Sequence, residues 1–261
     1  MLSQIPRNVG RDVANVLFFP LQAVAAEFDE LESLLSREEI ARADRYALDK
    51  LRRRYIIGRA RLRQLLGKLT ETPPAAVRIS YERRGKPKLD SNEVPLVHFN
   101  VAHSADWAAI AWATSEIGID LEIAQPGFQH ASIASQVLSQ TEQIQWDRIP
   151  ADKLDREMMR LWVCKEALLK AMGLGIGEGL REVSFELPIP TQKRFNPLAI
   201  GASLQLNIED DGTCARNHWT DCRSWSMHYL DAIPTAFIAL ATSARVQQVL
   251  TYSLDPSGNS Q

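Results

Sequence analysis

The stretch Gly118-Ile119-Asp120-Leu121-Glu122 places two carboxylates two residues apart among apolar side chains. In a β-strand successive side chains point to opposite faces, so Asp120 and Glu122 are expected on one face and the apolar residues on the other, toward a core. Two carboxylates on a rigid strand suit a divalent cation such as Mg²⁺, which prefers one or two carboxylates together with phosphate oxygens. These five residues alone also fit an exposed acidic strand face, because charged side chains are mostly solvated.

Length and composition set the broad class of the chain. Its 261 residues are enough for one large domain or two of ordinary size, and 45% hydrophobic with 24% charged residues is typical of a globular protein. With 30 basic against 32 acidic residues, nothing global indicates a nucleic-acid partner. No stretch approaches the ~18 apolar residues of a membrane-spanning helix. We therefore expect a cytoplasmic protein that binds neither nucleic acid nor membrane.

The cysteines give no sign of a disulfide scaffold, because they are odd in number and form no CxxC pair. Cys214, His218, Cys222 and His228 could be combined into a zinc site. Their spacings differ from those of common zinc modules, so we predict no structural zinc.

A strongly basic helix is predicted before the acidic strand, within residues 31–69. Ser36 followed by Glu39 fits a capping box, and apolar residues beyond it recur at helical spacing. Few acids lie at i±4 to pair with the basic residues of this helix, which are Arg52, Arg53, Arg54, Arg59, Arg61, Arg63 and Lys68. The run fits either a solvated face or a site for an anionic partner, since arginine forks match phosphate oxygens.

Strands are expected next over 77–81, 96–101 and 107–113, and the middle one leads into His103, whose small and polar neighbours leave room for a ligand. A long helix is expected over 154–172, with Glu166 and Lys170 at i, i+4, a spacing that alone fits an ordinary surface ion pair. Ser139 and Glu142 give a second capping-box spacing before it, so Glu142 has a structural explanation.

The remainder is rich in strands, which we expect over 183–187, 204–208, 223–230 and 235–241, and the tail from residue 253 is expected to be disordered. The chain thus has two halves of similar content, each a helix followed by strands. Composition and periodicity support an α+β fold and no more than that.

Three blocks stand in order along the chain. They are Gly85-Lys86-Pro87 with Phe99-Asn100-Val101-Ala102-His103-Ser104, then Gly118-Ile119-Asp120-Leu121-Glu122, then Trp162-Val163-Cys164-Lys165-Glu166-Ala167 with Lys170 and Gly173. In order and spacing they resemble the GKP, FNxSHS, G(I/V)D(I/L)E and WxxKEAxxKxxG signatures of the Sfp-type 4′-phosphopantetheinyl transferases. The resemblance covers residues 30–185 well and the rest only in strand content.

This resemblance implies a pseudo-dimer of two similar α/β subdomains, residues 1–115 and 116–252, with the active site in the cleft between them. Enzymes of this family move the 4′-phosphopantetheine arm of coenzyme A onto a serine of an acyl or peptidyl carrier protein. The products are the holo-carrier and adenosine 3′,5′-bisphosphate. Since one chain already supplies both halves of such a cleft, a monomer is expected.

The resemblance also implies roles for particular residues. Asp120, Glu122 and Glu166 would hold Mg²⁺ or Mn²⁺, which would neutralise the pyrophosphate of coenzyme A. Lys170 would stabilise charge on the leaving group. Glu166, Lys170 and His103 are the expected catalytic residues. Contacts to coenzyme A are expected from Lys170, His103, Lys86 and Arg59, the last at the 3′-phosphate. The base that takes the serine proton stays open between Glu166, Glu142 and a metal-bound water.

The chain departs from the family pattern at Ala102, where serine is common, so one hydroxyl expected near the phosphates is absent. The carboxylates and His103 are intact, and we do not interpret the change as loss of activity. The alternative function is a non-catalytic relative that binds coenzyme A or a carrier protein. The complete set of Asp120, Glu122, Glu166 and Lys170 argues against it, because a binding protein has no need of a full metal site.

Overall fold

The computed structural model describes residues 5–7, 9–82, 85–90, 97–124, 127–174, 179–190, 194–200 and 221–254. The first half contains β1 (Val13–Pro20), α1 (Ala25–Glu32), α2 (Arg37–Ala43), α3 (Asp49–Leu69), β2 (Ile79–Tyr81), β3 (Pro87–Leu89), β4 (His98–Ser104) and β5 (Trp107–Ala113). The second half contains β6 (Ile117–Ile123), α4 (Ala134–Val137), α5 (Gln140–Trp146), α6 (Leu154–Ala171), β7 (Val183–Ser184), β8 (Arg194–Phe195), β9 (Ala199–Ile200), β10 (Trp225–Tyr229), β11 (Ala236–Ser243) and β12 (Gln248–Ser253). The predicted α+β class is confirmed.

Two four-stranded sheets form the centre of the molecule, in the orders β12-β1-β5-β4 and β6-β11-β10-β8. Alternation along β1 divides its side chains between two cores. Leu17 and Phe19 pack with α3 residues such as Ile56, whereas Val16 and Phe18 pack with residues of the second sheet. The first sheet is therefore covered by α3 on one face and by the second sheet on the other.

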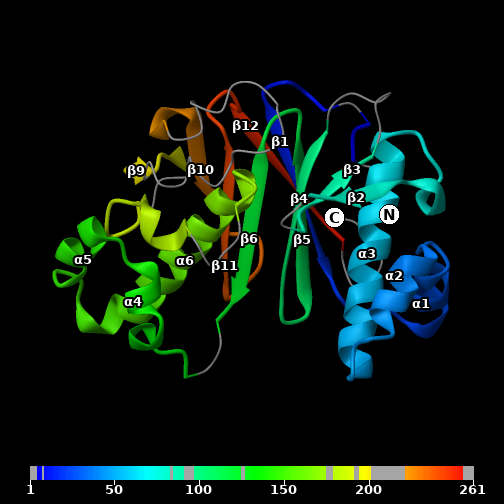
Figure 1. The fold of residues 1–261 in the computed structure, drawn as a ribbon, viewed down its shortest axis with the longest axis horizontal. Helices are drawn as coiled ribbons and strands as arrows, with labels where there is room; N and C mark the ends of the chain where they lie inside the picture. Colours follow the sequence, from blue (N-terminus) through cyan, green and yellow to red (C-terminus); the bar gives the residue numbers. More distant parts are fainter. Residues whose placement is uncertain are drawn as a thin grey trace.

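The second sheet repeats this division. Ile119 of β6 and Leu240 of β11 face the first sheet, whereas Ala239 and Ala241 of β11 pack in a cluster with α6 residues such as Leu168. The result is a succession of layers, with the helices α1–α3, the first sheet, the second sheet and then α6 with α4 and α5 (Figure 1). Both faces of each sheet are buried, which explains the almost continuous apolar runs of β1 and β5.

The strands β4 and β6 meet at the centre of the molecule. Each is the edge strand of its own sheet, and Figure 1 shows them side by side between the two helical layers. The buried Asn100 side chain of β4 accepts a hydrogen bond from the backbone N–H of Ile119 at 2.9 Å. The two halves of the chain are thus in direct contact along these edges.

Most of the predicted elements are present, with shifts at their ends. β5 has the predicted bounds, α6 ends one residue earlier than predicted, and both capping boxes, at Ser36 with Glu39 and at Ser139 with Glu142, are formed. The strand expected at 183–187 is shorter, because pairing with β9 involves only Val183 and Ser184. The strand expected over 204–208 lies outside the described residues, as do Cys214 and His218 of the zinc alternative.

The last strand crosses back to the beginning of the chain. β12 pairs in parallel with β1, with Gln248 beside Val13 and Ser253 beside Phe18. Ser253, the first residue of the expected disordered tail, therefore ends a strand, and the segment from residue 255 lies outside the described residues. By pairing, β12 belongs to the sheet of the first half, although the sequence assigns it to the second.

Candidate active site

The strand β6 carries the two predicted carboxylates on the side of the second sheet that faces α6. Ile117, Ile119 and Leu121 alternate with them and lie in the core between the sheets. Asp120 is 4% exposed, whereas Glu122, nearer the end of the strand, is half-buried. The predicted division of the strand is correct, but the acidic face is covered by a helix instead of being open to solvent.

The helix α6 brings Glu166 and Lys170 to this face. The ammonium Nζ of Lys170 donates to Oδ1 of Asp120 at 2.5 Å and lies 3.8 Å from Oε2 of Glu166. Glu166 is 2% exposed, so it is not part of the solvated surface pair that its spacing alone suggests. The structure therefore joins three of the predicted site residues in one buried cluster.

Gly118 allows the strand and the helix to approach this closely. A Cβ atom at position 118 would lie 2.1 Å from the carbonyl oxygen of Ala167 and 2.4 Å from the backbone nitrogen of Ala171. Real Cβ atoms do not approach backbone atoms at such distances. The glycine at the start of the acidic stretch is therefore a packing requirement that fixes the separation of Asp120 from α6.

Burial changes the protonation of the carboxylates. It raises the pKa of Asp120, an effect that the Lys170 ammonium opposes. It raises the pKa of Glu166 to about 7, with Lys170 opposing and the Asp120 and Glu122 charges adding to the rise. The pKa of Glu122 is also raised by burial, and the hydrogen bond from Ser104 opposes this. The carboxylates thus affect one another, as expected of groups that share a site.

Two carboxylate oxygens in the cluster have no hydrogen-bond partner, although both are buried: Oδ2 of Asp120 and Oε1 of Glu166. A buried charged acceptor without a partner is costly, and a cation bound by both oxygens would remove that cost. Among the described residues, no three histidine, cysteine, aspartate or glutamate side chains converge on one point as a preformed metal site. The hard oxygen donors fit a divalent cation, and Lys170 already supplies one positive charge there.

His103 and Lys86 approach the cluster from the first half of the chain. His103 is exposed at the end of β4, and its charge lowers the pKa of Asp120 slightly. The ammonium of Lys86 donates to the carbonyl oxygen of Lys170 at 2.7 Å, at the C-terminal end of α6, where a cation is favoured by the helix dipole. Lys86 therefore lies at the end of α6 that carries Lys170, and His103 lies near Asp120 of the same cluster.

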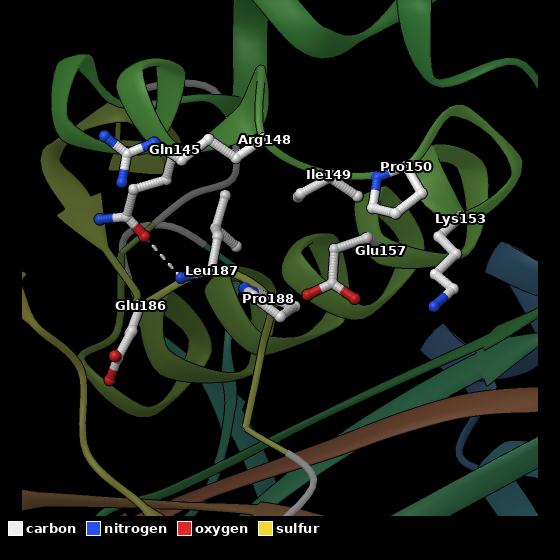
Figure 2. A pocket seen from close by; sticks show the side chains of 9 residues that line it. All are labelled: Gln145, Arg148, Ile149, Pro150, Lys153, Glu157, Glu186, Leu187 and Pro188. Carbon is white, nitrogen blue, oxygen red and sulfur yellow. Dashed lines mark hydrogen bonds between the residues drawn. The ribbon is translucent and has the colours of Figure 1, made fainter.

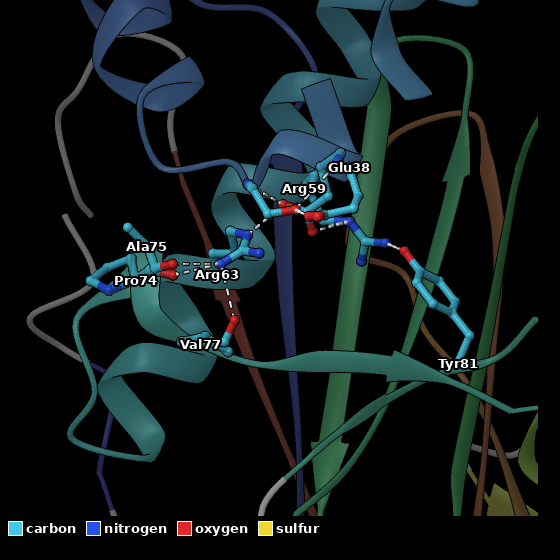
Figure 3. A network of polar contacts seen from close by, with 9 residues as sticks. Glu38, Arg59, Arg63, Pro74, Ala75, Val77 and Tyr81 are labelled. Carbon is cyan, nitrogen blue, oxygen red and sulfur yellow. Dashed lines mark hydrogen bonds and ion pairs between the residues drawn. The ribbon is translucent and has the colours of Figure 1, made fainter. Parts of the chain in front are cut away.

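Arg59 lies in a different part of the first half. Its Nε is 3.0 Å from Oε1 of Glu39, and its guanidinium donates to the Tyr81 hydroxyl (Figure 3). Arg63 Nε donates to the other carboxylate oxygen of Glu39, Oε2, at 2.6 Å. The Arg63 guanidinium also donates to the carbonyl oxygens of Pro74 and Val77. Both arginines are at most 9% exposed, so they are held by the protein itself.

The other arginines of α3 also have partners within the chain. Arg52 pairs with Glu32 at 2.7 Å and with Asp44, Arg54 pairs with Asp106, and Arg53 lies over the ring of Phe28 at 3.9 Å. The scarcity of acids at i±4 therefore does not leave these cations unpaired. Their partners come from α1, the end of α2 and the β4–β5 turn, which sequence spacing within the helix could not reveal.

A pocket of about 750 Å³ opens beside this network. Arg42 and Arg45, from the end of α2 and the turn after it, line it together with Tyr46, Tyr55 and Tyr81. Neither Arg42 nor Arg45 is among the residues predicted from the sequence, where their one signal is their position directly after the first capping box. Basic and aromatic side chains around one pocket suit a nucleotide, which offers both phosphate and a ring.

Glu142 is not available to a substrate. It has no exposed surface, and its carboxylate accepts from the backbone nitrogens of Ser139 and Phe185 and from the ammonium of Lys165, the last at 2.6 Å. Lys165 donates further to the carbonyl oxygens of Val137 and Leu180. The pair joins α6 to the α4–α5 region, which makes Glu142 structural and removes it from the possible general bases.

Ala102 lies in the core between the sheets and is 3% exposed, beside apolar residues such as Ile119 and Leu121. Its methyl group is therefore directed at the second sheet. A serine at this position would direct its hydroxyl into the contact between the two sheets, so the absence of that hydroxyl first affects the packing of the sheets.

A second pocket, of about 460 Å³, lies beside the end of α5 and the start of α6. Figure 2 shows that it is enclosed by Gln145, Arg148, Ile149, Pro150, Lys153, Glu157, Glu186, Leu187 and Pro188, with the Gln145 side chain hydrogen-bonded to the backbone of Leu187. None of the predicted site residues lines it. Its mixed charges indicate no particular ligand.

A buried carboxylate–lysine cluster between a strand and a helix, with a pocket lined by arginine and tyrosine side chains beside Glu38 and Glu39, is typical of an enzyme that handles phosphate groups. Comparison with known proteins is more specific. Residues 22–115 match the model of the 4′-phosphopantetheinyl transferase N-terminal region, and residues 116–222 match that of the 4′-phosphopantetheinyl transferase superfamily.

Individual relatives agree with these matches. The 4′-phosphopantetheinyl transferase HetI of Nostoc sp. is 35% identical over 207 residues, which is 78% of this chain and 86% of HetI. The 4′-phosphopantetheinyl transferase psf-1 of Bacillus pumilus is 29% identical over 62% of this chain and 67% of its own length. Sfp of Bacillus subtilis is 28% identical over 62% of this chain and 70% of Sfp. The chain belongs to the 4′-phosphopantetheinyl transferase superfamily, whose substrate is coenzyme A.

In the part of the chain that the structure describes, no helix has both the length and the apolar character needed to cross a lipid bilayer.

Proposed function

We propose that this protein transfers the 4′-phosphopantetheine arm of coenzyme A to a serine of an acyl or peptidyl carrier protein, as a Mg²⁺-dependent holo-carrier synthase. The serine oxygen forms a new bond to the phosphorus that bears the pantetheine. The bond from that phosphorus to the remaining nucleotide breaks, which releases adenosine 3′,5′-bisphosphate. The serine proton passes to a base.

The observation that carries this proposal is the cluster of Asp120, Glu166 and Lys170. Two of its carboxylate oxygens are buried without a hydrogen-bond partner, and a lysine lies beside them. A protein that only binds coenzyme A would gain nothing from holding such a cluster in its interior, because each buried unpaired oxygen lowers its stability.

Asp120, Glu122 and Glu166 are the residues that would hold Mg²⁺ or Mn²⁺. When bound, such an ion neutralises pyrophosphate oxygens and makes the phosphorus more open to attack. The carboxylates themselves stand on two regular elements, a strand and a helix, whose separation is set by Gly118. Their positions are therefore fixed before the substrate arrives, which lowers the cost of organising the site during the reaction.

Lys170 is proposed to stabilise the charge that develops on the departing bisphosphate. Its side chain is half-buried and reaches the carboxylate cluster from the last turn of α6. Glu166 is the side chain in the cluster that could also receive the serine proton. Glu142, the rival side chain, is fully buried in its pair with Lys165.

Coenzyme A is proposed to lie across the first half of the chain. Lys86, at the end of α6, and His103, near Asp120, suit its pyrophosphate, and Lys170 contacts the same phosphates from the other side. Arg59 supports the 3′-phosphate region through Tyr81, which lines the pocket of Arg42 and Arg45. Those two arginines are better exposed to a ligand than Arg59 is, so we assign them the more direct contact.

The architecture is proposed to be a pseudo-dimer of residues 1–115 and 116–252, with the active site in the cleft between them. The two sheets, each covered by one long helix, support this division. The exception is β12, which joins the first sheet. A single chain then supplies both halves, so we propose that the protein works as a monomer. A cytoplasmic location stays a prediction.

Intact-protein mass spectrometry tests the function directly. An apo acyl carrier protein is incubated with this protein, coenzyme A and Mg²⁺, and with EDTA or the Asp120→Ala variant as controls. We expect the carrier to gain one phosphopantetheine, and the gain to be lost in both controls. No gain with carriers of fatty-acid, polyketide or nonribosomal-peptide synthesis, despite measurable coenzyme A binding, would favour the non-catalytic alternative.

A further inference from the structure

The contact between β4 and β6 replaces a backbone ladder by side-chain hydrogen bonds. The two strands are the edges of different sheets, so each presents backbone groups that its own sheet does not use. Buried backbone donors need partners. On β6 the N–H group of buried Ile119 and that of half-buried Ile123 both donate to side chains of β4.

The side chains that accept these bonds are Asn100 and Ser104. Asn100 Oδ1 accepts from the Ile119 nitrogen at 2.9 Å, and Ser104 Oγ accepts from the Ile123 nitrogen at 3.1 Å. In both contacts the two residues are 19 positions apart in the sequence, so β4 and β6 run parallel and keep the same register from one contact to the other. Both residues belong to the Phe99–Ser104 stretch, and neither has a role in the proposed reaction.

Ser104 makes a further contact that Asn100 does not. Its hydroxyl donates to Oε2 of Glu122 at 2.7 Å. A serine hydroxyl has one donor and two acceptor positions, so the same oxygen can fix the backbone of Ile123 and the carboxylate of Glu122. Glu122 is half-buried and stands near the end of β6, and the hydroxyl of Ser104 is the hydrogen-bond donor to its carboxylate.

We propose that Ser104 is a positioning residue that orients the Glu122 carboxylate toward the cation, while Asn100 holds β6 in register with β4. This inference rests on the proposed role of Glu122 as a metal ligand. Partners that orient a ligating carboxylate typically alter metal affinity 10- to 100-fold when they are removed. Ser104 would act on the site across the boundary between the two halves, from the strand that also carries His103.

The test is direct binding of Mn²⁺ to the full chain, measured by electron paramagnetic resonance in the presence of saturating coenzyme A. We expect Ser104→Ala to weaken Mn²⁺ binding about tenfold, and Ser104→Thr, which keeps the hydroxyl and suits a strand, to stay close to wild type. Ser184→Ala is the matched control. It removes a different serine hydroxyl, which is buried, donates to Ser139 Oγ at 2.8 Å and makes no hydrogen bond to Glu122 in the described part of the chain. Its Mn²⁺ affinity should be unchanged.

Glu122→Gln distinguishes a failure of the positioning role of Ser104 from a failure of the metal site itself. If it weakens Mn²⁺ binding and Ser104→Ala does not, the positioning role of Ser104 is wrong and the proposed function stands. If wild type, Glu122→Gln and Asp120→Ala all bind Mn²⁺ alike, the metal site itself is wrong. Should Ser104→Ala fail to fold, Ser104→Cys replaces it, since it keeps the volume but provides only a weak donor and acceptor, and the same weakening is expected.

Discussion

The ammonium of Lys170 lies 2.5 Å from Oδ1 of Asp120, so a helix cation and a strand carboxylate from opposite sides of the site are in direct contact. The same ammonium is 3.8 Å from Glu166. A lysine so close to two carboxylates both neutralises them and repels any other cation. Repulsion by Lys170 should weaken cation binding, whereas its proposed contact with the leaving group should accelerate the reaction. Cation binding and transfer activity can be measured separately.

Lys170→Met should therefore change binding and activity in opposite directions. Without the ammonium, the free protein should bind Mn²⁺ about 3- to 10-fold more tightly, since a unit charge at ~4 Å contributes on the order of 1 kcal/mol in water. Transfer activity should fall at least ~100-fold, as is usual when a group that stabilises transition-state charge is removed. Mn²⁺ titration and a carrier-modification assay measure the two quantities. Weaker Mn²⁺ binding in this variant would contradict the arrangement described.

Gly118→Ala should destabilise the protein and disable the site together. The new methyl group would meet backbone atoms of Ala167 and Ala171, and backbone cannot rotate away as a flexible side chain does. We expect a loss of about 3 kcal/mol or more in the free energy of unfolding, measured by urea denaturation.

Gly58→Ala is the control for this substitution. In α3 its methyl group would lie 3.5 Å from Leu21 Cδ2, an ordinary contact. Replacing a helical glycine by alanine there should leave stability unchanged or raise it by up to about 1 kcal/mol. Equal losses in the two variants would show that the close approach of β6 and α6 is not the cause.

The acidic strand and the long helix could be predicted because their signals are local. Alternation around Asp120 and helical spacing around Glu166 each identify an element without knowledge of the rest of the chain. What sequence spacing could not reveal are contacts made across long separations. The acids that pair with Arg52 and Arg54 lie on other elements, and β12 pairs with β1, which lies near the opposite end of the chain.

The same limit applies within the site. The sequence identified Asp120, Glu166 and Lys170 as candidates, but their burial depends on how α6 lies over β6, which no local pattern determines. Arg42 and Arg45 were missed because two arginines near a helix end resemble any solvated turn. Only the pocket they line with Tyr81 distinguishes them.

Lys165→Met should cost about 3–5 kcal/mol of stability, because it leaves the Glu142 carboxylate buried without its cation. Urea denaturation at neutral pH measures the loss. The exposed Lys153 provides the control, since Lys153→Met should change stability by at most about 0.5 kcal/mol.

A double-mutant cycle separates the ion pair from general packing. Glu142→Gln removes the buried charge, so its combination with Lys165→Met should be less destabilising than the sum of the two single changes, by about 1–3 kcal/mol. Strict additivity would mean that the pair makes no contribution as a pair. The α4–α5 region would then be joined to α6 by apolar contacts and by the hydrogen bonds of Lys165 to backbone carbonyl oxygens.

His228 should make stability depend on pH below neutrality. Burial, assisted by the charge of Arg194, lowers the pKa of His228 to about 4, and its Nε2 lies 3.1 Å from the Thr242 hydroxyl. In the unfolded chain histidine titrates near 6.5. Between these pH values the unfolded state binds a proton that the folded state does not bind. The contribution of neutral His228 to the free energy of unfolding is therefore complete above pH ~6.5 and is lost as the pH falls toward 4. From pH 7 to pH 5 we expect a loss of about 1–2 kcal/mol, measured by urea denaturation at both values. His228→Gln has no such titration, so the loss should be smaller in this variant by that amount. An identical loss in wild type and variant would assign the acid sensitivity to other groups.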